Sequence, residues 1–227
     1  RLWDALFFAS SLLGSFLLGV TFANLFRGVP INAQGVFEGS LLTLLNPYAL
    51  LGGGLFLLMF MVHGALWIAV KTEGELAARA GRAAGGLWVA LAVIAAGFLV
   101  ASVYETRLFD NYLSRPGLFI IPAAMAGSLF FTGLLIYRRR WLWAWVASAL
   151  TIVYAAFFGL FGIYPALLPS RLSRAYDITL ANASSSDLTL KIMLGVLLVF
   201  APLVIAYQSW VYFVFKDHAA EERGGHG

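Results

Sequence analysis

The 227-residue sequence contains no cysteine. Disulfide bonds, thiolate ligation of haem iron, iron–sulfur clusters and cysteine zinc sites are therefore excluded within it. Charge is also scarce, because charged residues make up 11% of the sequence, whereas a soluble domain has about 25%. Hydrophobic residues reach 61%, and the mean hydropathy is +0.86. This composition indicates an integral membrane protein.

The motifs of common soluble enzymes are missing as well. The sequence has no phosphate-binding loop, no GxSxG or HExxH motif, and no pair of carboxylates within an apolar run. The net charge of +4 is concentrated next to the apolar runs, which fits contact with anionic lipid rather than nucleic acid.

Long apolar runs predict six membrane-spanning helices. A hydrocarbon core of about 30 Å needs about 20 helical residues, whereas barrel strands would alternate over about ten residues. We therefore expect an all-α membrane protein whose residues 1–227 form a single transmembrane domain. The expected spans are residues 3–26, 47–70, 85–104, 117–137, 141–163 and 188–215, followed by a tail of residues 216–227.

The basic residues predict the orientation of these spans. Nine lie on one side of the membrane and six on the other, and the tight "YRRRW" turn at 137–141 lies on the richer side. Because cytoplasmic loops carry an excess of Lys and Arg, we place that side and the C-terminus in the cytoplasm.

The connecting segments carry local signals. The stretch between the first two spans predicts a short interfacial helix, and Pro165 ends the fifth span. Residues 184–187 supply N-cap chemistry for the sixth span. Lys71, Glu75 and Arg79 are spaced four apart, which predicts that the second helix continues for a few turns beyond the membrane.

His63 is the sharpest candidate for chemistry, because it lies within an apolar span. Met59 lies one turn before it, but side chains four apart point the same way and cannot bracket one haem iron. The other histidines, His218 and His226, are in the tail, so a His/His haem within this chain is excluded. A His/Met or single-His haem stays open, and a buried, hydrogen-bonded histidine is favoured.

Asp4 is the second candidate, at the end of the first span that we place on the cytoplasmic side. A first-turn acid is stabilised by the positive end of the helix dipole, which is the structural interpretation. The functional alternative is a residue of a proton path or a subunit contact.

Several blocks together resemble subunit II of the cytochrome bd quinol oxidases, in the same order and with matching spacers. They are "RLWDALFFASSLLGSFLLGVTFANLFRGVP", "LLNPYALLGG", "HGALWIAVKTEGEL", "GLFGIYPALLPS" and "NASSSDLTLKIMLGVLLVFAPLVIAYQSWVY". The resemblance runs from one end of the chain to the other.

The resemblance implies a subunit of a respiratory terminal oxidase in the bacterial inner membrane, which oxidises quinol and reduces oxygen to water. The implied partner is the haem-bearing subunit I, which holds haems b and d, together with a small single-helix accessory subunit. This chain is then a non-catalytic, structural subunit that binds no haem, lies near a proton path and contacts a quinone or lipid.

Two departures from the family matter. Family members have about three further spans before the point that matches Arg1, so we expect a piece of a longer polypeptide. Asp4, in "LWD", is the one intramembrane acid that matches a family motif. At the position of His63 the family also uses glutamine, a poor iron ligand, which implies that His63 is not a haem ligand and contacts at most a quinone.

Two other classes remain as alternatives. A polytopic transporter should have paired broken helices in two repeat halves, and only Pro202 interrupts a span. A haem-binding electron-transfer protein needs a second axial ligand, for which only Met61, Met125 and Met193 are available.

Overall fold

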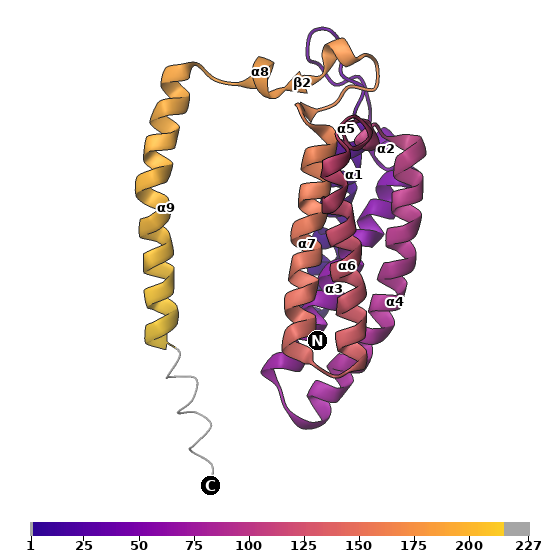
Figure 1. Ribbon diagram of the computed structural model, residues 1–227, viewed down its shortest axis with the longest axis vertical. Coiled ribbons are helices and arrows are strands. Elements are labelled where there is room, and N and C mark those ends of the chain that lie inside the picture. Colours follow the sequence, from indigo (N-terminus) through magenta and orange to yellow (C-terminus); the bar gives the residue numbers. More distant parts are fainter. Residues whose placement is uncertain (1, 216–227) are drawn as a thin grey trace. The chain divides into compact units, whose positions relative to one another are not determined.

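The computed structural model describes residues 2–215, and the expectation of an all-α membrane protein is confirmed (Figure 1). Six of the described helices are long and apolar enough to cross a membrane. The elements are α1 (Leu2–Arg27), α2 (Leu41–Leu44), α3 (Pro47–Lys71), α4 (Gly74–Glu105), α5 (Leu108–Ser114), the 3-10 helix η1 (Pro116–Phe119), α6 (Ile120–Tyr137), α7 (Trp141–Ile163), β1 (Ala166–Leu168), the 3-10 helix η2 (Arg174–Tyr176), β2 (Ile178–Thr179), α8 (Leu180–Ala183) and α9 (Asp187–Phe215). His218 and His226 lie outside the described residues.

The chain divides into two compact units, residues 1–180 and residues 181–227. In the second unit, α9 begins as its sequence predicts, because the Thr189 N–H donates to the Ser186 hydroxyl at 3.4 Å. The first unit contains the other five long helices and is called the bundle below. The expectation of a single domain over residues 1–227 stays a prediction.

Helix α3 is the centre of the bundle and packs against α1, α4 and α7, while α6 packs against α7 and α4. The core between them is built from buried side chains such as Met59, Leu66 and Leu91. Two glycines bring α1 and α3 together, since a Cβ on Gly19 would lie 2.3 Å from the carbonyl oxygen of Gly52. Any larger residue at Gly19 must push these helices apart.

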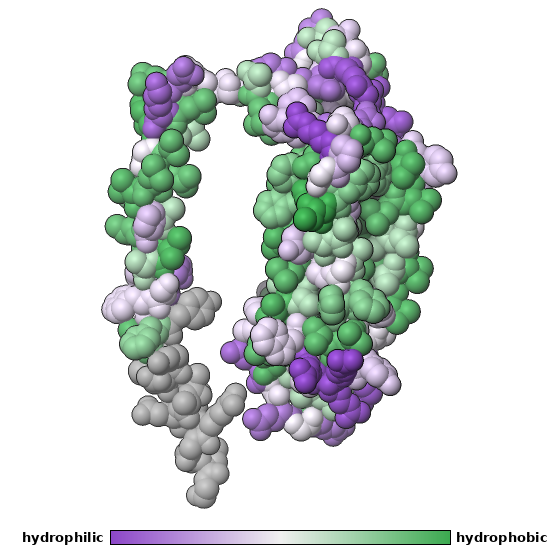
Figure 2. Space-filling model, in the orientation of Figure 1, coloured by the Kyte–Doolittle hydropathy of each residue, from purple (hydrophilic) through white to green (hydrophobic). Residues whose placement is uncertain are grey.

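The helices run back and forth, so the bundle has two ends. The loop end holds residues 28–46, 106–119 and 164–180, and the turn end holds the short connections at residues 72–73 and 138–140 (Figure 1). Figure 2 shows hydrophobic residues over the length of the bundle and hydrophilic residues gathered at its two ends. This distribution is that of a multi-pass membrane protein.

The prediction that the second helix continues beyond the membrane was wrong. Helix α3 ends at Lys71, where the Thr72 hydroxyl donates to the Ile68 carbonyl, and Gly74 has φ +63°. Because this left-handed conformation suits glycine, the chain turns here and the charged stretch begins α4. The helix that contains the expected third span, residues 85–104, therefore starts at Gly74. Lys71 and Glu75 lie on different helices, although their spacing fits a single one.

The connections at the loop end are longer. Helix α2 forms within the stretch that predicted a short helix, and α7 ends at Ile163, just before Pro165. β1 and β2 pair antiparallel. The Ser170 hydroxyl donates to the Ile31 carbonyl at 2.7 Å, which ties the first long connection to the last one in the bundle.

Candidate functional site

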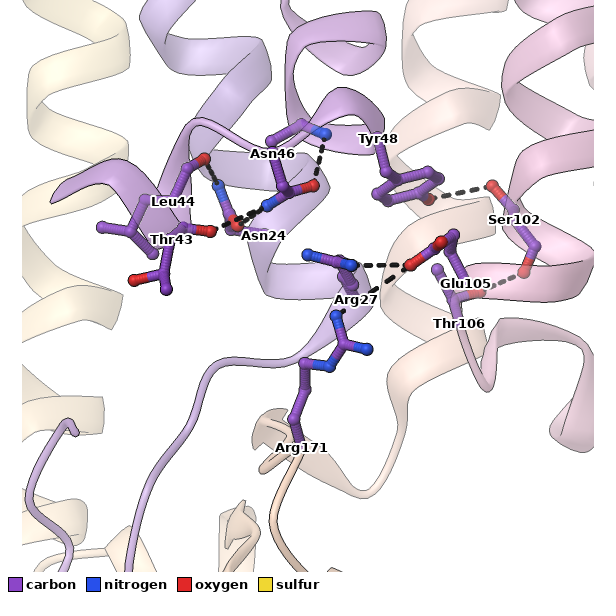
Figure 3. Close-up of polar contacts among 11 residues, drawn as sticks. Asn24, Arg27, Thr43, Leu44, Asn46, Tyr48, Ser102, Glu105, Thr106 and Arg171 are labelled. Atoms are coloured by element: carbon purple, nitrogen blue, oxygen red, sulfur yellow. Dashed lines mark hydrogen bonds and ion pairs between the residues drawn. The ribbon is translucent and has the colours of Figure 1, made fainter. Parts of the chain in front are cut away.

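A polar network lies at the loop end of the bundle, and Figure 3 shows its parts. Asn24 of α1 donates to the Val20 and Leu44 carbonyls at 2.9 and 2.7 Å. The Asn46 amide donates to the Asn24 side-chain oxygen at 2.9 Å, and its own oxygen accepts from the Ala49 N–H at 3.0 Å. Asn46 therefore caps α3 while Asn24 holds that cap against α1.

A second part of this network joins α3 to α4. The buried Ser102 hydroxyl donates to the Phe98 carbonyl at 2.7 Å, so its oxygen accepts from the Tyr48 hydroxyl at 2.9 Å (Figure 3). The Tyr48 ring also stacks on Phe98 with 4.8 Å between ring centroids. A buried tyrosine is thus satisfied at both its apolar and its polar end.

Ion pairs complete the loop end. Glu105 Oε2 lies 2.8 Å from Arg27 Nε and 3.9 Å from an Arg171 guanidinium nitrogen (Figure 3), and Arg174 lies 2.7 Å from Asp110. The side chains of Glu105 and Arg171 are 40% and 43% exposed, so each pair contributes only about 0–1 kcal/mol. These groups line a cavity of about 400 Å³, which lies between the end of α4, helix α5 and the end of α7.

The α5 helix is anchored at the same end by Tyr112. Its hydroxyl donates to the Phe158 carbonyl at 2.7 Å, and its ring stacks on Phe158. Burial disfavours the charged phenolate and raises the pKa of Tyr112 to about 12. Tyr112 therefore acts as a neutral donor that fixes α5 on α7.

His63 lies between α3 and α7, eight residues before the end of α3 and thus about 12 Å along the helix from the turn end. Its Nδ1 lies 2.8 Å from the Ser148 hydroxyl oxygen, and its ring stacks on Trp145 with 5.2 Å between centroids. Trp145 also contacts Trp67, whose ring is tilted by 39° with 5.0 Å between centroids, and the Lys71 ammonium lies 4.7 Å from the Trp67 ring centroid.

The hydrogen bonds assign the tautomer of His63. The Ser148 hydroxyl lies 2.7 Å from the Trp145 carbonyl, which can only accept. When the hydroxyl donates there, Ser148 can only accept from His63, so Nδ1 carries the proton and Nε2 is left as an acceptor. Nε2 has no hydrogen-bond partner within residues 2–215, and the Trp145 indole N–H is buried without one there. His63 is partly exposed, so its Nε2 can bind a further polar partner, whereas the Trp145 N–H is enclosed.

The second predicted residue, Asp4, lies in the first turn of α1. Every residue from Leu2 to Gly14 is exposed, so this half of α1 presents its apolar side chains around the whole helix surface. The two candidates thus lie on different helices, His63 half-buried against α7 and Asp4 exposed. Their roles stay predictions.

An apolar cavity of about 220 Å³ lies among α3, α4, α6 and α7. It is lined by Met59, Leu91, Met125 and other apolar side chains, and by Thr151, which is already bonded to the Ala147 carbonyl. Such a cavity suits an apolar chain rather than water. Residues 2–215 contain no group of three or more His, Asp or Glu side chains that could hold a metal ion.

Sequence reasoning missed the loop-end network. Its strongest signal was Asn24, an amide three residues before the end of an apolar span, since a polar group there needs a partner. Tyr48 carries no such signal, because tyrosine is common near the ends of spans. Ser102 carries none either, because a serine can bond to the backbone of its own helix, as it does to the Phe98 carbonyl.

Comparison with known proteins places this chain in a family. A family model for cytochrome bd terminal oxidase subunit II matches residues 1–215. The chain is 32% identical to cytochrome bd ubiquinol oxidase subunit 2 of Bacillus subtilis (strain 168), over 98% of the chain and 65% of that protein. It is 28% identical to cytochrome bd-I ubiquinol oxidase subunit 2 of Escherichia coli (strain K12), over 98% of the chain and 67% of that protein.

A further relative is the probable cytochrome oxidase subunit 2 of Haemophilus influenzae, which is 29% identical over 92% of the chain and 64% of that protein. The chain therefore spans about two thirds of the length of the curated relatives that it matches. Since the family model covers nearly all of its residues, this chain belongs to the cytochrome bd terminal oxidase subunit II family.

Proposed function

We propose that this chain is part of a non-catalytic, structural subunit of a bd-type quinol oxidase in the bacterial inner membrane. A haem-bearing subunit I would oxidise quinol and reduce oxygen to water, and would hold haems b and d. The observation that carries the proposal is the family match over residues 1–215, supported by relatives named as ubiquinol oxidase subunits. It favours this function over a transporter or a separate haem-binding electron carrier.

The exposed first half of α1 supports a role in assembly. Trp3, Phe7 and Phe8 are 81%, 76% and 65% exposed, and they lie within a helix that crosses the membrane. Large aromatic side chains can pack closely against a partner helix, whereas contact with lipid tails alone does not require them. We expect this surface to be covered by subunit I or by the spans that precede this point in the family, with a single-helix accessory subunit as a further partner. We place the turn end and C-terminus in the cytoplasm.

In the same proposal, Asp4 and His63 contribute to proton entry or to the subunit contact. Asp4 lies at the turn end, where protons would enter from the cytoplasm. The free acceptor Nε2 of His63 can receive a hydrogen bond from a partner side chain or a quinol hydroxyl. The apolar cavity is large enough for part of a lipid or isoprenoid chain.

Affinity purification of the full-length protein from native membranes tests this function. The protein should co-purify with a multi-spanning, haem-bearing partner, and the complex should consume oxygen when given a quinol. A pyridine haemochrome assay on the separated chains should find haem in the partner. Absence of such a partner, or stoichiometric haem in this chain, would show that the proposal is wrong.

A further inference from the structure

A second cavity, of about 490 Å³, lies at the turn end of the bundle. One wall is the first three turns of α4, which include Gly81 and Gly85. The opposite wall is the end of α6 and the start of α7, with Ile136 and Trp141. The Trp141 ring lies directly on α4, since a Cβ on Gly81 would be 2.4 Å from its Cη2 atom. The cavity therefore has an apolar floor.

Two arginines also line this cavity, Arg82 of α4 and Arg139 of the turn between α6 and α7. Both are exposed, and neither has a carboxylate partner or a hydrogen-bond acceptor for its side chain within the part of the chain that the structure describes. Arg138 and Arg140 flank Arg139 and are equally exposed and unpaired there. Among residues 2–215, no Asp or Glu lines the cavity, so the charged side chains that these residues contribute to it are all positive.

The backbone of Arg139 adds an independent observation. Helix α6 ends in a Schellman motif, in which the Arg140 N–H donates to the Leu135 carbonyl at 2.9 Å and the Arg139 N–H to the Ile136 carbonyl at 3.0 Å. This motif puts Arg139 at φ +54°, a left-handed conformation that glycine adopts more readily. The fold alone would favour glycine at this position, so the arginine is better explained by its charge.

We propose that this cavity binds the phosphate group of an anionic phospholipid. Arg82 and Arg139 would contact the phosphate oxygens, since guanidinium groups bind phosphate through paired, charge-assisted hydrogen bonds. Ile136 and Trp141 would contact the glycerol and the first carbons of the acyl chains. The cavity lies at the turn end, beside the connections at residues 72–73 and 138–140, and Figure 2 shows hydrophilic residues gathered at that end. A lipid headgroup lies at such a boundary between apolar spans and a hydrophilic end.

Lipid binding tests the proposal directly. The full-length protein is purified in a mild detergent and titrated with spin-labelled phosphatidylglycerol, with unlabelled phosphatidylglycerol and phosphatidylcholine as competitors. We expect the variant R82Q/R139Q to raise the apparent Kd for phosphatidylglycerol by about tenfold, because two charge-assisted contacts are lost. Phosphatidylcholine should compete weakly with the labelled lipid.

A matched control removes the same charge from the loop end. R107Q/R115Q should leave the Kd within about twofold of the unsubstituted protein, since neither residue lines the turn-end cavity. An equal loss in the control, an unchanged Kd in R82Q/R139Q, or equal competition by phosphatidylcholine would overturn the proposal. Displacement of the labelled lipid by millimolar inorganic phosphate would identify free phosphate as the ligand instead and would also overturn it.

A third variant separates binding from folding. Arg139→Gly suits the left-handed backbone, so it should raise the melting temperature by about 2 °C while it weakens phosphatidylglycerol binding. Weaker binding together with a lower melting temperature would assign the effect to the fold and overturn the proposal. Oxidase activity is not a readout here, so the outcome is independent of the proposed function.

Discussion

The two ends of the bundle are built from the same helices and are both rich in arginine, yet three loop-end arginines are paired with carboxylates and, in the described part of the chain, the arginines of the turn-end cavity are not. At the loop end, Arg27 and Arg171 share Glu105, and Arg174 pairs with Asp110. At the turn end, Arg82 and Arg139 have no such partners within residues 2–215. Charge that is neutralised within the chain serves the fold, whereas charge left open is available to something outside it.

The loop end should therefore be sensitive to substitution, and Asn24 most of all. Asn24→Ala removes the partner of the Leu44 carbonyl and of the Asn46 amide, and an unsatisfied buried polar group costs about 1–3 kcal/mol. We expect a loss of about 3 kcal/mol in the free energy of unfolding, measured by denaturant titration in detergent micelles. Arg82→Ala, at the turn end, is the comparison and should cost less than about 0.5 kcal/mol. Equal costs would show that the two ends do not differ.

The next largest loss in the free energy of unfolding is expected at the hydroxyl pair of Tyr48 on α3 and Ser102 on α4. Ser102→Ala leaves the buried Tyr48 hydroxyl without its acceptor and should cost about 1.5 kcal/mol in the free energy of unfolding. The double variant Tyr48→Phe with Ser102→Ala should cost no more than the single Ser102→Ala, because the orphaned hydroxyl is then absent. Strictly additive losses would show that the two hydroxyls do not act as a pair.

This contrast explains which parts of the structure could be predicted from the sequence. Apolar run length predicted the helices, because each span must satisfy its own backbone in lipid. Charge spacing misassigned Glu75, since a spacing of four fits either helix beside the glycine that turns the chain. The loop-end network could not be predicted, because Arg27 and Glu105 are 78 residues apart and only packing brings them together. His63 was found from its burial in an apolar span, but Ser148, its partner on α7, was not.

The ion pairs should give a smaller effect than the buried amides. Glu105→Gln keeps an acceptor for Arg27 but leaves two guanidinium groups without a counter-charge, which should cost about 1 kcal/mol because the site is partly exposed. The difference from the unsubstituted protein should shrink as salt is raised from 0.01 to 1 M, since the Debye length falls from about 30 to about 3 Å. A cost that is independent of salt would point to lost packing rather than lost charge.

The smallest effect is expected at His63, which lies between the two ends and belongs to neither charge pattern. In His63→Gln, the side-chain amide can still bond to the Ser148 hydroxyl, and only the stacking on Trp145 is lost. The free energy of unfolding should change by less than about 1 kcal/mol, and haem content and quinol oxidation by the complex should stay nearly unchanged. The measurements are denaturant titration, a haemochrome assay and oxygen uptake. Loss of haem in this variant would make His63 an iron ligand, and loss of oxygen uptake alone would make its free Nε2 part of the proton path.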